Sequence, residues 1–256
     1  SLDVPVDEAD ERALPIAVGL AEAWGLPIRL LHLPGRLRQG RDALDLGAVV
    51  ERASRRWSDL SIEAVELQGD DVADAVVGAA SGGGLLVVST DNANAWSFKN
   101  SVAERLVDRV TGPIVLIGPE AGSSLPGGGI VAAYDGRPSA EAALDAAASL
   151  AAALGHRLWL VQVVRQPLPG DTDEAPPVGA ELHRRTAALD PRLGARWEVI
   201  QSNDPVHAIE HFADRVDASF VVASARGRTD QTRTTMSSIT MGLVAAAGRP
   251  VLVVHQ

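Results

Sequence analysis

Two short segments of the C-terminal half combine residue types that can hold a phosphate-bearing ligand. Tyr134-Asp135-Gly136 follows one apolar run, and Ser224-Ala-Arg-Gly227 follows another, with nine residues between it and Ser237-Ser238. Gly227 lets the backbone turn sharply and approach a phosphate closely. Free amides at the start of a helix near Ser238 favour an anion. The carboxylate of Asp135 can accept hydrogen bonds from a ribose or an adenine amine.

The same residues also fit a plainer interpretation. Arg226, Arg228 and Arg233 add positive charge to an otherwise acidic chain, but they can equally be solvated surface residues. Gly227 is then only a turn, and Ser238 is only the N-cap of a helix. Because short motifs often match by chance, the residues alone favour this plainer interpretation.

An open parallel sheet would place the two segments where ligands bind. In such a sheet the ligand lies beyond the carboxyl ends of the strands, at the point where the strand order reverses. Short apolar runs alternate with helical segments, which predicts parallel strands and right-handed crossovers. In the C-terminal half we expect strands at 130–134, 158–164, 195–201, 220–223 and 251–254, and helices at 139–154, capped by Ser139, 180–189, 205–216, started by Asp204 and Pro205, and 238–247.

The N-terminal half repeats this order. Residues 101–117 return without a gap as residues 238–254. A long repeat that is present only twice indicates a duplicated domain. Only Ser1-Leu2 precedes Asp3, whereas a full strand precedes Asp135, so the first strand is missing. Either the natural chain has further residues upstream of Ser1, which we favour, or the first sheet lacks a strand near its centre. The other strands are expected at 28–33, 62–67, 85–89 and 114–117, and the helices at 7–24, 43–57, 71–80 and 100–110.

The predicted fold class is α/β with two tandem domains, each a five-stranded parallel sheet sandwiched by helices. The domains are expected at 1–118 and 130–256, with the Gly-rich segment 119–129 as the linker. The apolar strands 114–117 and 251–254 each follow or begin near a proline, which suits sheet edges that need cover. We therefore expect these two strands to pair with each other in an intramolecular pseudo-dimer. A homodimer of the whole chain is also compatible with this pattern.

At these residues the chain resembles the universal stress protein family. The family's mark is a strand ending in Asp-Gly-Ser, then Gly-x-x-Gly, nine residues, and Gly-Ser or Gly-Thr before a helix and a Pro-Val-Leu-Val-Val strand. Here Asp135-Gly136, Ser224-Ala-Arg-Gly227, Ser237-Ser238 and Pro250-Val-Leu-Val-Val254 follow in that order. The resemblance covers nearly the whole chain. It implies a domain of the universal stress protein and adenine nucleotide alpha hydrolase-like type, and many family members bind ATP.

The resemblance also implies which residues contact an adenine nucleotide. Asp135 would contact the adenosine, and the backbone of Val163 would meet the adenine edge. Serines replace two of the three motif glycines, and the side chain of Ser237 would either crowd the phosphates or replace a lost contact. ATP would bind weakly, with Mg²⁺ brought by the nucleotide. The implied contact residues are Asp135, Val163, Ser224, Arg226, Gly227, Ser237 and Ser238.

The first copy departs further from the family pattern. Val4 stands where a glycine would follow Asp3, and Asn100 takes the place of the third motif glycine. We therefore expect that the first domain does not bind ATP, and that Trp96 and Phe98 fill or cover the vacated cleft.

Composition and charge argue against several classes of function. The net charge of -10 opposes binding to duplex nucleic acid. The chain has no cysteine, which excludes disulfides and thiolate metal sites and suits a cytoplasmic protein. No apolar run has membrane-spanning length, and the acidic start does not match a signal peptide. A small-molecule partner is therefore expected, with no nucleic acid and no membrane.

Enzymatic and metal chemistry have little support in the residues. The chain has neither a Gly-x-Ser-x-Gly elbow nor a P-loop. Slow ATP hydrolysis is allowed by the resemblance alone. His207 and His211 stand one helical turn apart near Glu210 and Asp214, but no third ligand stands out, so a solvated helix face is the preferred interpretation.

Two functions follow from the sequence. In the first, the chain is a tandem universal stress protein that acts as a nucleotide-responsive regulatory module in the stress response, with ATP bound in the second domain. In the rival, neither domain binds nucleotide, and the chain is a scaffold that acts through dimerisation or protein contacts.

Overall fold

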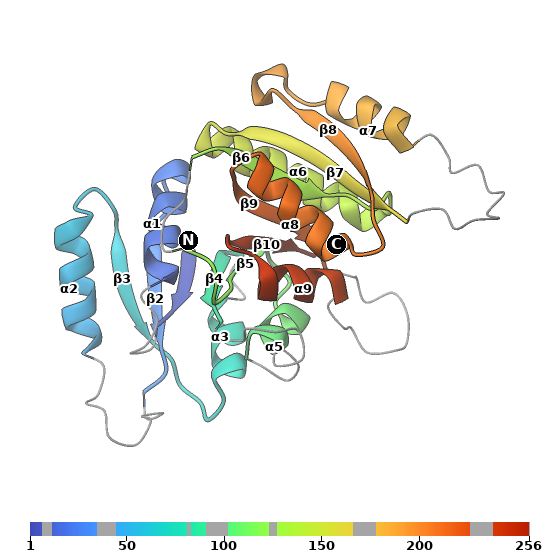
Figure 1. Ribbon diagram of the computed structural model, residues 1–256. Helices are drawn as coiled ribbons and strands as arrows, with labels where there is room; N and C mark the ends of the chain where they lie inside the picture. The colour runs from blue at the N-terminus through green and yellow to red at the C-terminus, as the bar shows by residue number, and fades with distance from the viewer. Residues whose placement is uncertain are drawn as a thin grey trace.

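The strands of the two halves form a single ten-stranded sheet (Figure 1). Its order is β3-β2-β1-β4-β5-β10-β9-β6-β7-β8. The computed structural model describes residues 1–6, 12–34, 45–80, 83–90, 102–122, 127–165, 178–225 and 238–255. None of the helices in these ranges is long and apolar enough to cross a membrane.

The first half contains a parallel five-stranded part of this sheet. The strands expected at 85–89 and 114–117 are confirmed, and the other expected strands differ by one residue at an end. The strands are β1 Leu2–Pro5, β2 Ile28–His32, β3 Ile62–Glu66, β4 Leu85–Ser89 and β5 Ile114–Ile117, and the helices are α1 Ala13–Trp24, α2 Leu46–Arg56, α3 Val72–Ala80 and α5 Val102–Arg109.

The second half repeats the same parallel arrangement. Apolar runs again form the central strands, because both faces of these strands are buried under helices. The strands are β6 Gly129–Ala133, β7 Arg157–Val164, β8 Arg196–Gln201, β9 Ala218–Ser224 and β10 Val251–Val254, and the helices are α6 Pro138–Leu154, α7 Val178–Ala187, the 3₁₀ helix η1 Pro191–Leu193, α8 Pro205–Arg215 and α9 Ser238–Ala246.

The two halves join through their last strands. β10 pairs with β5 in antiparallel orientation, with Leu252 opposite Val115. This confirms the expected pairing of the two proline-preceded strands. Each strand covers the open edge of the other, so neither backbone edge is left free at the junction.

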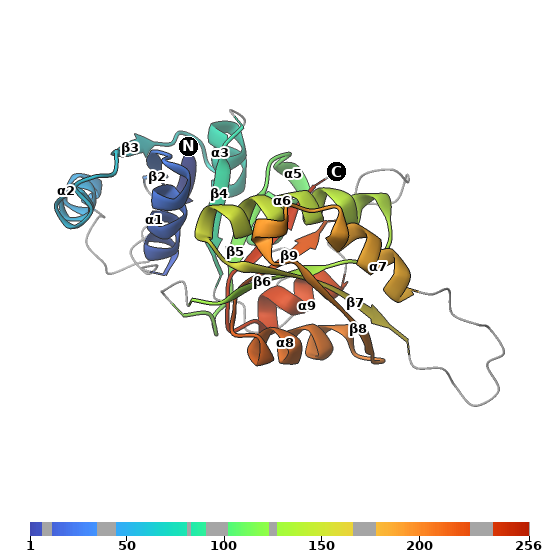
Figure 2. The same ribbon diagram turned by 90° about the horizontal axis from the view of Figure 1, so that it is seen from above.

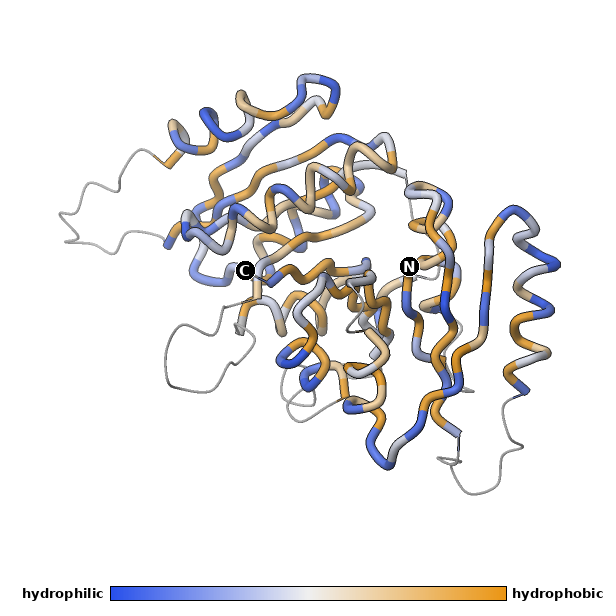
Figure 3. The backbone as a smooth tube through the Cα atoms, turned by 180° about the vertical axis from the view of Figure 1, so that it is seen from behind, coloured by the Kyte–Doolittle hydropathy of each residue, from blue (hydrophilic) through white to orange (hydrophobic). Residues whose placement is uncertain are grey.

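Helices cover both faces of the sheet. Seen from above, α6 and α7 lie on one side of the second-half strands, and α8 and α9 lie on the other (Figure 2). One buried cluster joins α1 and α6 to their face of the sheet, and a second joins α3, α5, α8 and α9 to the opposite face. Both clusters contain residues from both halves. The backbone is mainly hydrophobic along the central strands and more hydrophilic along the outer helices (Figure 3).

The helix ends follow local chemistry at several positions. Gly155 ends α6 with a left-handed φ of 66°, as expected for a C-terminal glycine. Asp204 accepts a hydrogen bond from the backbone N–H of His207 and so caps α8. The expected cap at Ser139 is wrong, because α6 already begins at Pro138, whose ring presets the helical φ at the first position.

The expectation that the first strand is missing is also wrong. β1 spans Leu2–Pro5 and lies between β2 and β4. Leu2 is paired with Ile28, and Ile28 comes three residues after Gly25. In the second half, Ile130 is paired with Leu158, which comes three residues after Gly155. Asp3 therefore lies inside the strand, at the position that Val131 has in the second half.

This register changes the comparison between the halves. The sequence position that corresponds to Asp135 is Asp7, which lies outside the described residues. The sequence comparison sets Asp3 opposite Asp135, whereas the strand pairing shifts that correspondence by four positions. Val4 therefore does not replace a motif glycine.

Asp3 instead forms an ion pair inside the first half. Its side chain is 1% exposed and accepts two hydrogen bonds of 2.7 Å from Arg29 on β2. Arg29 also donates to the carbonyl of Ala79 at the end of α3. The pair therefore ties β1, β2 and α3 together through charge rather than through apolar packing.

Candidate functional site

The strand order of the second half reverses between β6 and β9. β7 and β8 lie on one side of β6, whereas β9 and β10 lie on the other. The segment 134–136 follows β6, and Ser224 ends β9. The two candidate segments therefore begin on neighbouring strands at the edge where an open α/β sheet binds ligands.

Asp135 presents its carboxylate to solvent at this edge. Its side chain is 52% exposed, and its Oδ1 accepts a hydrogen bond of 3.0 Å from the backbone N–H of Arg137. The guanidinium of Arg137 lies 3.6 Å from Oδ2. Gly136 has a φ of 78°, which favours glycine and lets the chain turn directly after the carboxylate. The carboxylate is held in place and remains open to a ligand.

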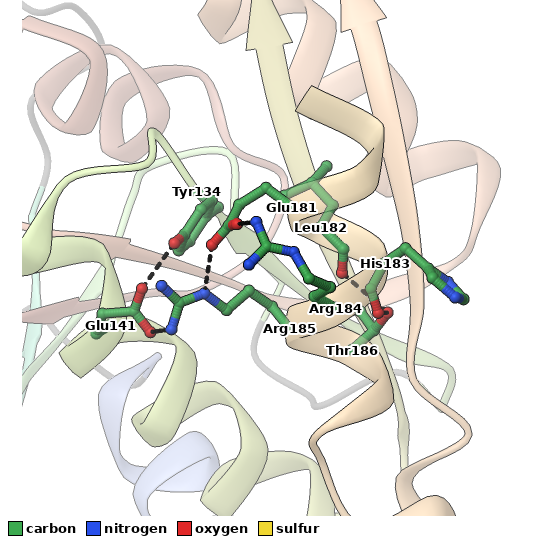
Figure 4. Close-up of polar contacts among 8 residues, drawn as sticks. All are labelled: Tyr134, Glu141, Glu181, Leu182, His183, Arg184, Arg185 and Thr186. Carbon is green, nitrogen blue, oxygen red and sulfur yellow. Dashed lines mark hydrogen bonds and ion pairs between the residues drawn. The ribbon is translucent and has the colours of Figure 1, made fainter. Parts of the chain in front are cut away.

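The residue before Asp135 is held by a polar network (Figure 4). Tyr134 is buried, and its hydroxyl donates to Oε1 of Glu141 over 2.6 Å. Arg185 on α7 donates to Glu141 over 2.9 Å and to Glu181 over 2.7 Å. Burial and the hydrogen bond to Glu141 raise the pKa of Tyr134 to about 12. The network therefore fixes the end of β6 against α6 and α7.

A cavity of about 500 Å³ lies beside the carboxyl ends of β7 and β8. Val163 lines it from β7, and Ile239 lines it from the first turn of α9 with 38% of its surface exposed. Asp135 is not among its lining residues. The remaining lining residues are Arg165, Ser202, Asn203 and Pro205.

The end of β9 is joined to the start of α9. The hydroxyl of Thr240 donates to the carbonyl of Ser224 over 3.4 Å. α9 begins at Ser238, as expected from the sequence. Arg226, Gly227 and Ser237 lie outside the described residues, so the structure places the two ends of the predicted phosphate segment and not its middle.

The sequence did not identify Ile239, Asn203 and Thr240 as residues of the site. Ile239 could have been identified, because it is an apolar residue next to Ser238, the predicted contact at the start of the helix. No sequence feature marked Asn203 and Thr240 as part of the site, because short polar residues are common near helix starts.

The solvated face expected on α8 is confirmed for His207 and His211, but Glu210 departs from it. Both histidines are exposed, but the side chain of Glu210 is only 14% exposed and lies against Arg249. Burial raises the pKa of Glu210 to about 7. Arg249 also contacts Asp214 and donates to the carbonyl of Ala218. Among the described residues, no three potential ligands gather around a metal position.

In the first half, the corresponding segment lies mostly beyond what the structure describes. Thr90 follows β4 and is buried, and its backbone N–H donates to Ile117. The expectations for Trp96, Phe98 and Asn100 fall in residues 91–101, outside the described part.

The sequence of the second half is similar to a known protein family. The family model described as Universal stress protein family matches residues 129–255, which run from β6 to the end of β10. Through this half, the chain belongs to the universal stress protein family. None of the curated proteins matches the sequence.

Solved structures extend the likeness in fold to the first half. A universal stress protein from Archaeoglobus fulgidus DSM 4304 is 18% identical, and the match covers 100% of this chain and 96% of that chain at a TM-score of 0.71. A protein from Pseudomonas aeruginosa UCBPP-PA14 is 16% identical, with 99% and 92% covered and a TM-score of 0.70. The whole chain therefore has the fold of a universal stress protein, and that fold is present in tandem.

Some universal stress proteins bind nucleotides. One from Archaeoglobus fulgidus was solved in complex with dAMP; it is 24% identical, and the match covers 49% of this chain and 95% of that chain at a TM-score of 0.38.

Proposed function

We propose that this tandem universal stress protein binds an adenine nucleotide in its second half and acts as a nucleotide-responsive regulatory module in the stress response. The observation that carries the proposal is the meeting of three elements at the switch point. The exposed Asp135 follows β6, and Ser224 ends the neighbouring β9. α9, which starts at Ser238, is joined to Ser224 by the hydroxyl of Thr240.

The chemistry of this edge suits a nucleotide. A carboxylate that is half exposed and held by its own turn can accept hydrogen bonds from a ribose. The start of α9 offers backbone N–H groups and the positive end of the helix dipole to a phosphate. The cavity beside Val163 has a volume in the range of small-molecule sites. In this proposal the contact residues are Asp135, Val163, Ser224, Arg226, Gly227, Ser237 and Ser238, and Mg²⁺ arrives with ATP.

The same proposal assigns nucleotide binding to one half only. The functional division runs between residues 1–118 and 130–256, with 119–129 as the linker. The first half lacks the motif glycines in residues 90–100, so we expect it to stabilise the pseudo-dimer without binding ATP. We place the protein in the cytoplasm, where ATP is abundant.

Titration of the full chain with Mg-ATP tests the proposal. Binding to the folded state alone raises the free energy of unfolding by about 1.4 kcal/mol when ATP is tenfold above its Kd. We expect Gly227→Leu to abolish the calorimetric heat and the rise in Tm, because a bulky side chain there would occupy the phosphate path. Asn100→Leu, at the first-half position that corresponds to Ser237, should leave both unchanged.

The rival function predicts a different result. If the serines at 224 and 237 have closed the site, millimolar Mg-ATP will give neither heat nor a change in Tm. The proposal would then be withdrawn in favour of a scaffold that acts through protein contacts. Circular dichroism of each variant confirms that a lost signal reflects lost binding and not unfolding.

A further inference from the structure

A second cavity lies at the opposite edge of the second-half sheet. Its volume is about 470 Å³, and it lies where β6 and β7 begin and where α6 and α8 end. The rise of a strand puts Arg157 roughly 20 Å from Val163 along β7, so this cavity is separate from the nucleotide edge. It is lined by Gly128, Gly129, Gly155, His156, Arg157, Trp159, Arg192, Leu193, Gly194 and Val216.

Hydrogen-bond donors dominate this lining. Arg157 and Arg192 line the cavity, and no carboxylate does. Arg196 lies over the lining residue Trp159, with its guanidinium carbon 5.6 Å from the centre of the ring. Among the residues that the structure describes, none of these three guanidinium groups has an ion pair, whereas Arg29 pairs with Asp3. The cavity therefore concentrates unneutralised positive charge on a chain whose net charge is -10.

The histidine of the cavity is held by a chain of hydrogen bonds. The hydroxyl of Ser219 donates to the carbonyl of Gly129 over 3.2 Å, so its oxygen is left to accept from Nδ1 of His156 over 2.9 Å. This arrangement places the N–H on Nδ1 and leaves Nε2 without a partner among the described residues. The ring is therefore oriented by the protein interior and not by solvent.

The first half shows that the fold does not require these charges. Arg196 is paired with Trp159 as Glu63 is paired with Arg29, so Arg196 corresponds to Glu63. Counting back four residues without a gap makes Arg192 correspond to Asp59. The same two positions are thus basic in one copy and acidic in the other, although the strands around them superimpose in order and register.

Helix capping does not explain the arginines. α6 and α8 both end near the cavity, and cations near helix C-termini can bind the last carbonyls. In the described chain, however, neither Arg157 nor Arg192 donates from its side chain to a carbonyl. The backbone N–H groups of Gly155 and His156 already bond to carbonyls of the last turn of α6.

We propose that this cavity binds a small molecule through its phosphate or pyrophosphate group. Two guanidinium groups at one cavity suit the bidentate recognition of phosphate oxygens. Four glycines in the lining keep the backbone accessible, and the volume suits a small molecule. The site is present in one half only, and it is independent of the nucleotide edge.

Inorganic pyrophosphate is the probe, and the full chain is the protein. We expect calorimetric binding by the native chain and movement of the indole N–H signal of Trp159 in ¹H–¹⁵N spectra. Arg192→Asp with Arg196→Glu installs the charges that the first half carries at the same positions. This double variant should weaken binding about tenfold or more, because it removes charge-assisted donors to the phosphate oxygens and puts carboxylates that repel the anion in their place.

The matched control changes the same charge elsewhere. Arg52→Asp with Arg56→Glu alters two exposed arginines of α2 and should leave pyrophosphate binding unchanged. Gly227→Leu should also leave it unchanged, which separates this site from the nucleotide site. Absence of binding at millimolar pyrophosphate overturns the proposal. So does binding that survives the double variant but is lost in Gly227→Leu, because the anion would then belong to the nucleotide edge.

Discussion

At the scale of single residues, the duplicated fold fills equivalent positions in different ways. Asp3 and Arg29 form a buried ion pair in the first half, and Val131 and Trp159 occupy the same paired positions in the second. Removing one partner of a buried pair leaves an uncompensated charge, whereas replacing both with apolar residues is often tolerated. The second half shows that apolar residues at both positions are compatible with this sheet.

This difference predicts an asymmetric pair of substitutions. Arg29→Met leaves Asp3 charged at 1% exposure and should lower the free energy of unfolding by about 3–5 kcal/mol. Asp3→Val should cost less, because Arg29 is 26% exposed and can regain water. The double variant should recover much of the loss. Urea unfolding of the four proteins measures the coupling, and a strictly additive double variant would contradict the proposed role of the pair.

Glu210 predicts a pH dependence of stability. Burial raises its pKa to about 7 in the folded chain, above the value of about 4.3 in an unfolded chain. The folded state therefore holds more protons between these values, and stability falls as pH rises from about 4.3 to 7. Glu210→Gln should flatten this part of the profile and stabilise the protein by roughly 2–3 kcal/mol at neutral pH.

Chemical unfolding at several pH values tests this expectation. Glu22→Gln, which changes an exposed carboxylate on α1, serves as the control and should keep the native slope. If both variants follow the same profile as the native chain, the buried carboxylate is not the source of the slope.

At the scale of elements, the Tyr134 network holds β6, α6 and α7 together next to the nucleotide edge. Tyr134 is the chain's only tyrosine, so its ionisation can be followed directly by ultraviolet absorbance. We expect the native protein to titrate near pH 12 and the unfolded chain near 10. Because the folded pKa is raised, the stability that depends on neutral Tyr134 is present below pH 10 and is lost between 10 and 12.

Removal of the hydroxyl tests the same network at neutral pH. Tyr134→Phe should lower the free energy of unfolding by about 1–3 kcal/mol, since Glu141 loses a charge-assisted donor. The alkaline loss of stability should disappear in this variant. A native titration near pH 10 would show that the hydroxyl is free in solution and that the network does not form.

The positions of most elements were predictable from the sequence. Strands β4, β5 and β10 have the expected bounds, because continuous apolar runs bounded by glycine, proline or polar residues have few alternatives. β1 was missed because Asp3 was aligned with Asp135, which follows its strand, whereas Asp3 lies inside β1. Only the partner on β2 makes that carboxylate compatible with a buried strand, and such a partner is not visible in local sequence.

At the scale of the whole molecule, the chain is built as one continuous sheet with two halves. β5 and β10 form the antiparallel junction, and His255 follows β10 directly. Its ring nitrogens lie 2.7 Å from the carbonyl of Val107 and 3.2 Å from that of Gly112, both in the first half. The side chain of His255 therefore makes polar contacts that join the two halves.

Removal of these contacts should destabilise the junction between β5 and β10. We expect His255→Ala to lower the free energy of unfolding by about 1–2 kcal/mol, because it removes the ring that contacts the carbonyls of Val107 and Gly112 and donates a hydrogen bond there. Hydrogen exchange should increase in β5 and β10 more than in β2 or β7. The control His211→Ala changes an exposed histidine of α8 and should have little effect. Equal exchange in the native protein and His255→Ala would show that strand pairing alone holds the halves.

The sequence by itself determined the α/β class, the duplication, most of the elements and the pairing of the last strands. These features depend on apolar periodicity, glycine and proline positions and self-similarity, which are local or repeated properties of the chain. It also identified Asp135 and Ser238 as candidate site residues, because the spacing of motif residues can be read directly from the sequence. Only the tertiary structure decided that Asp3 is a buried partner of Arg29, that Glu210 faces Arg249, and that Arg157 and Arg192 share a cavity. Burial and charge pairing depend on residues that are distant in sequence, so no local pattern contains them.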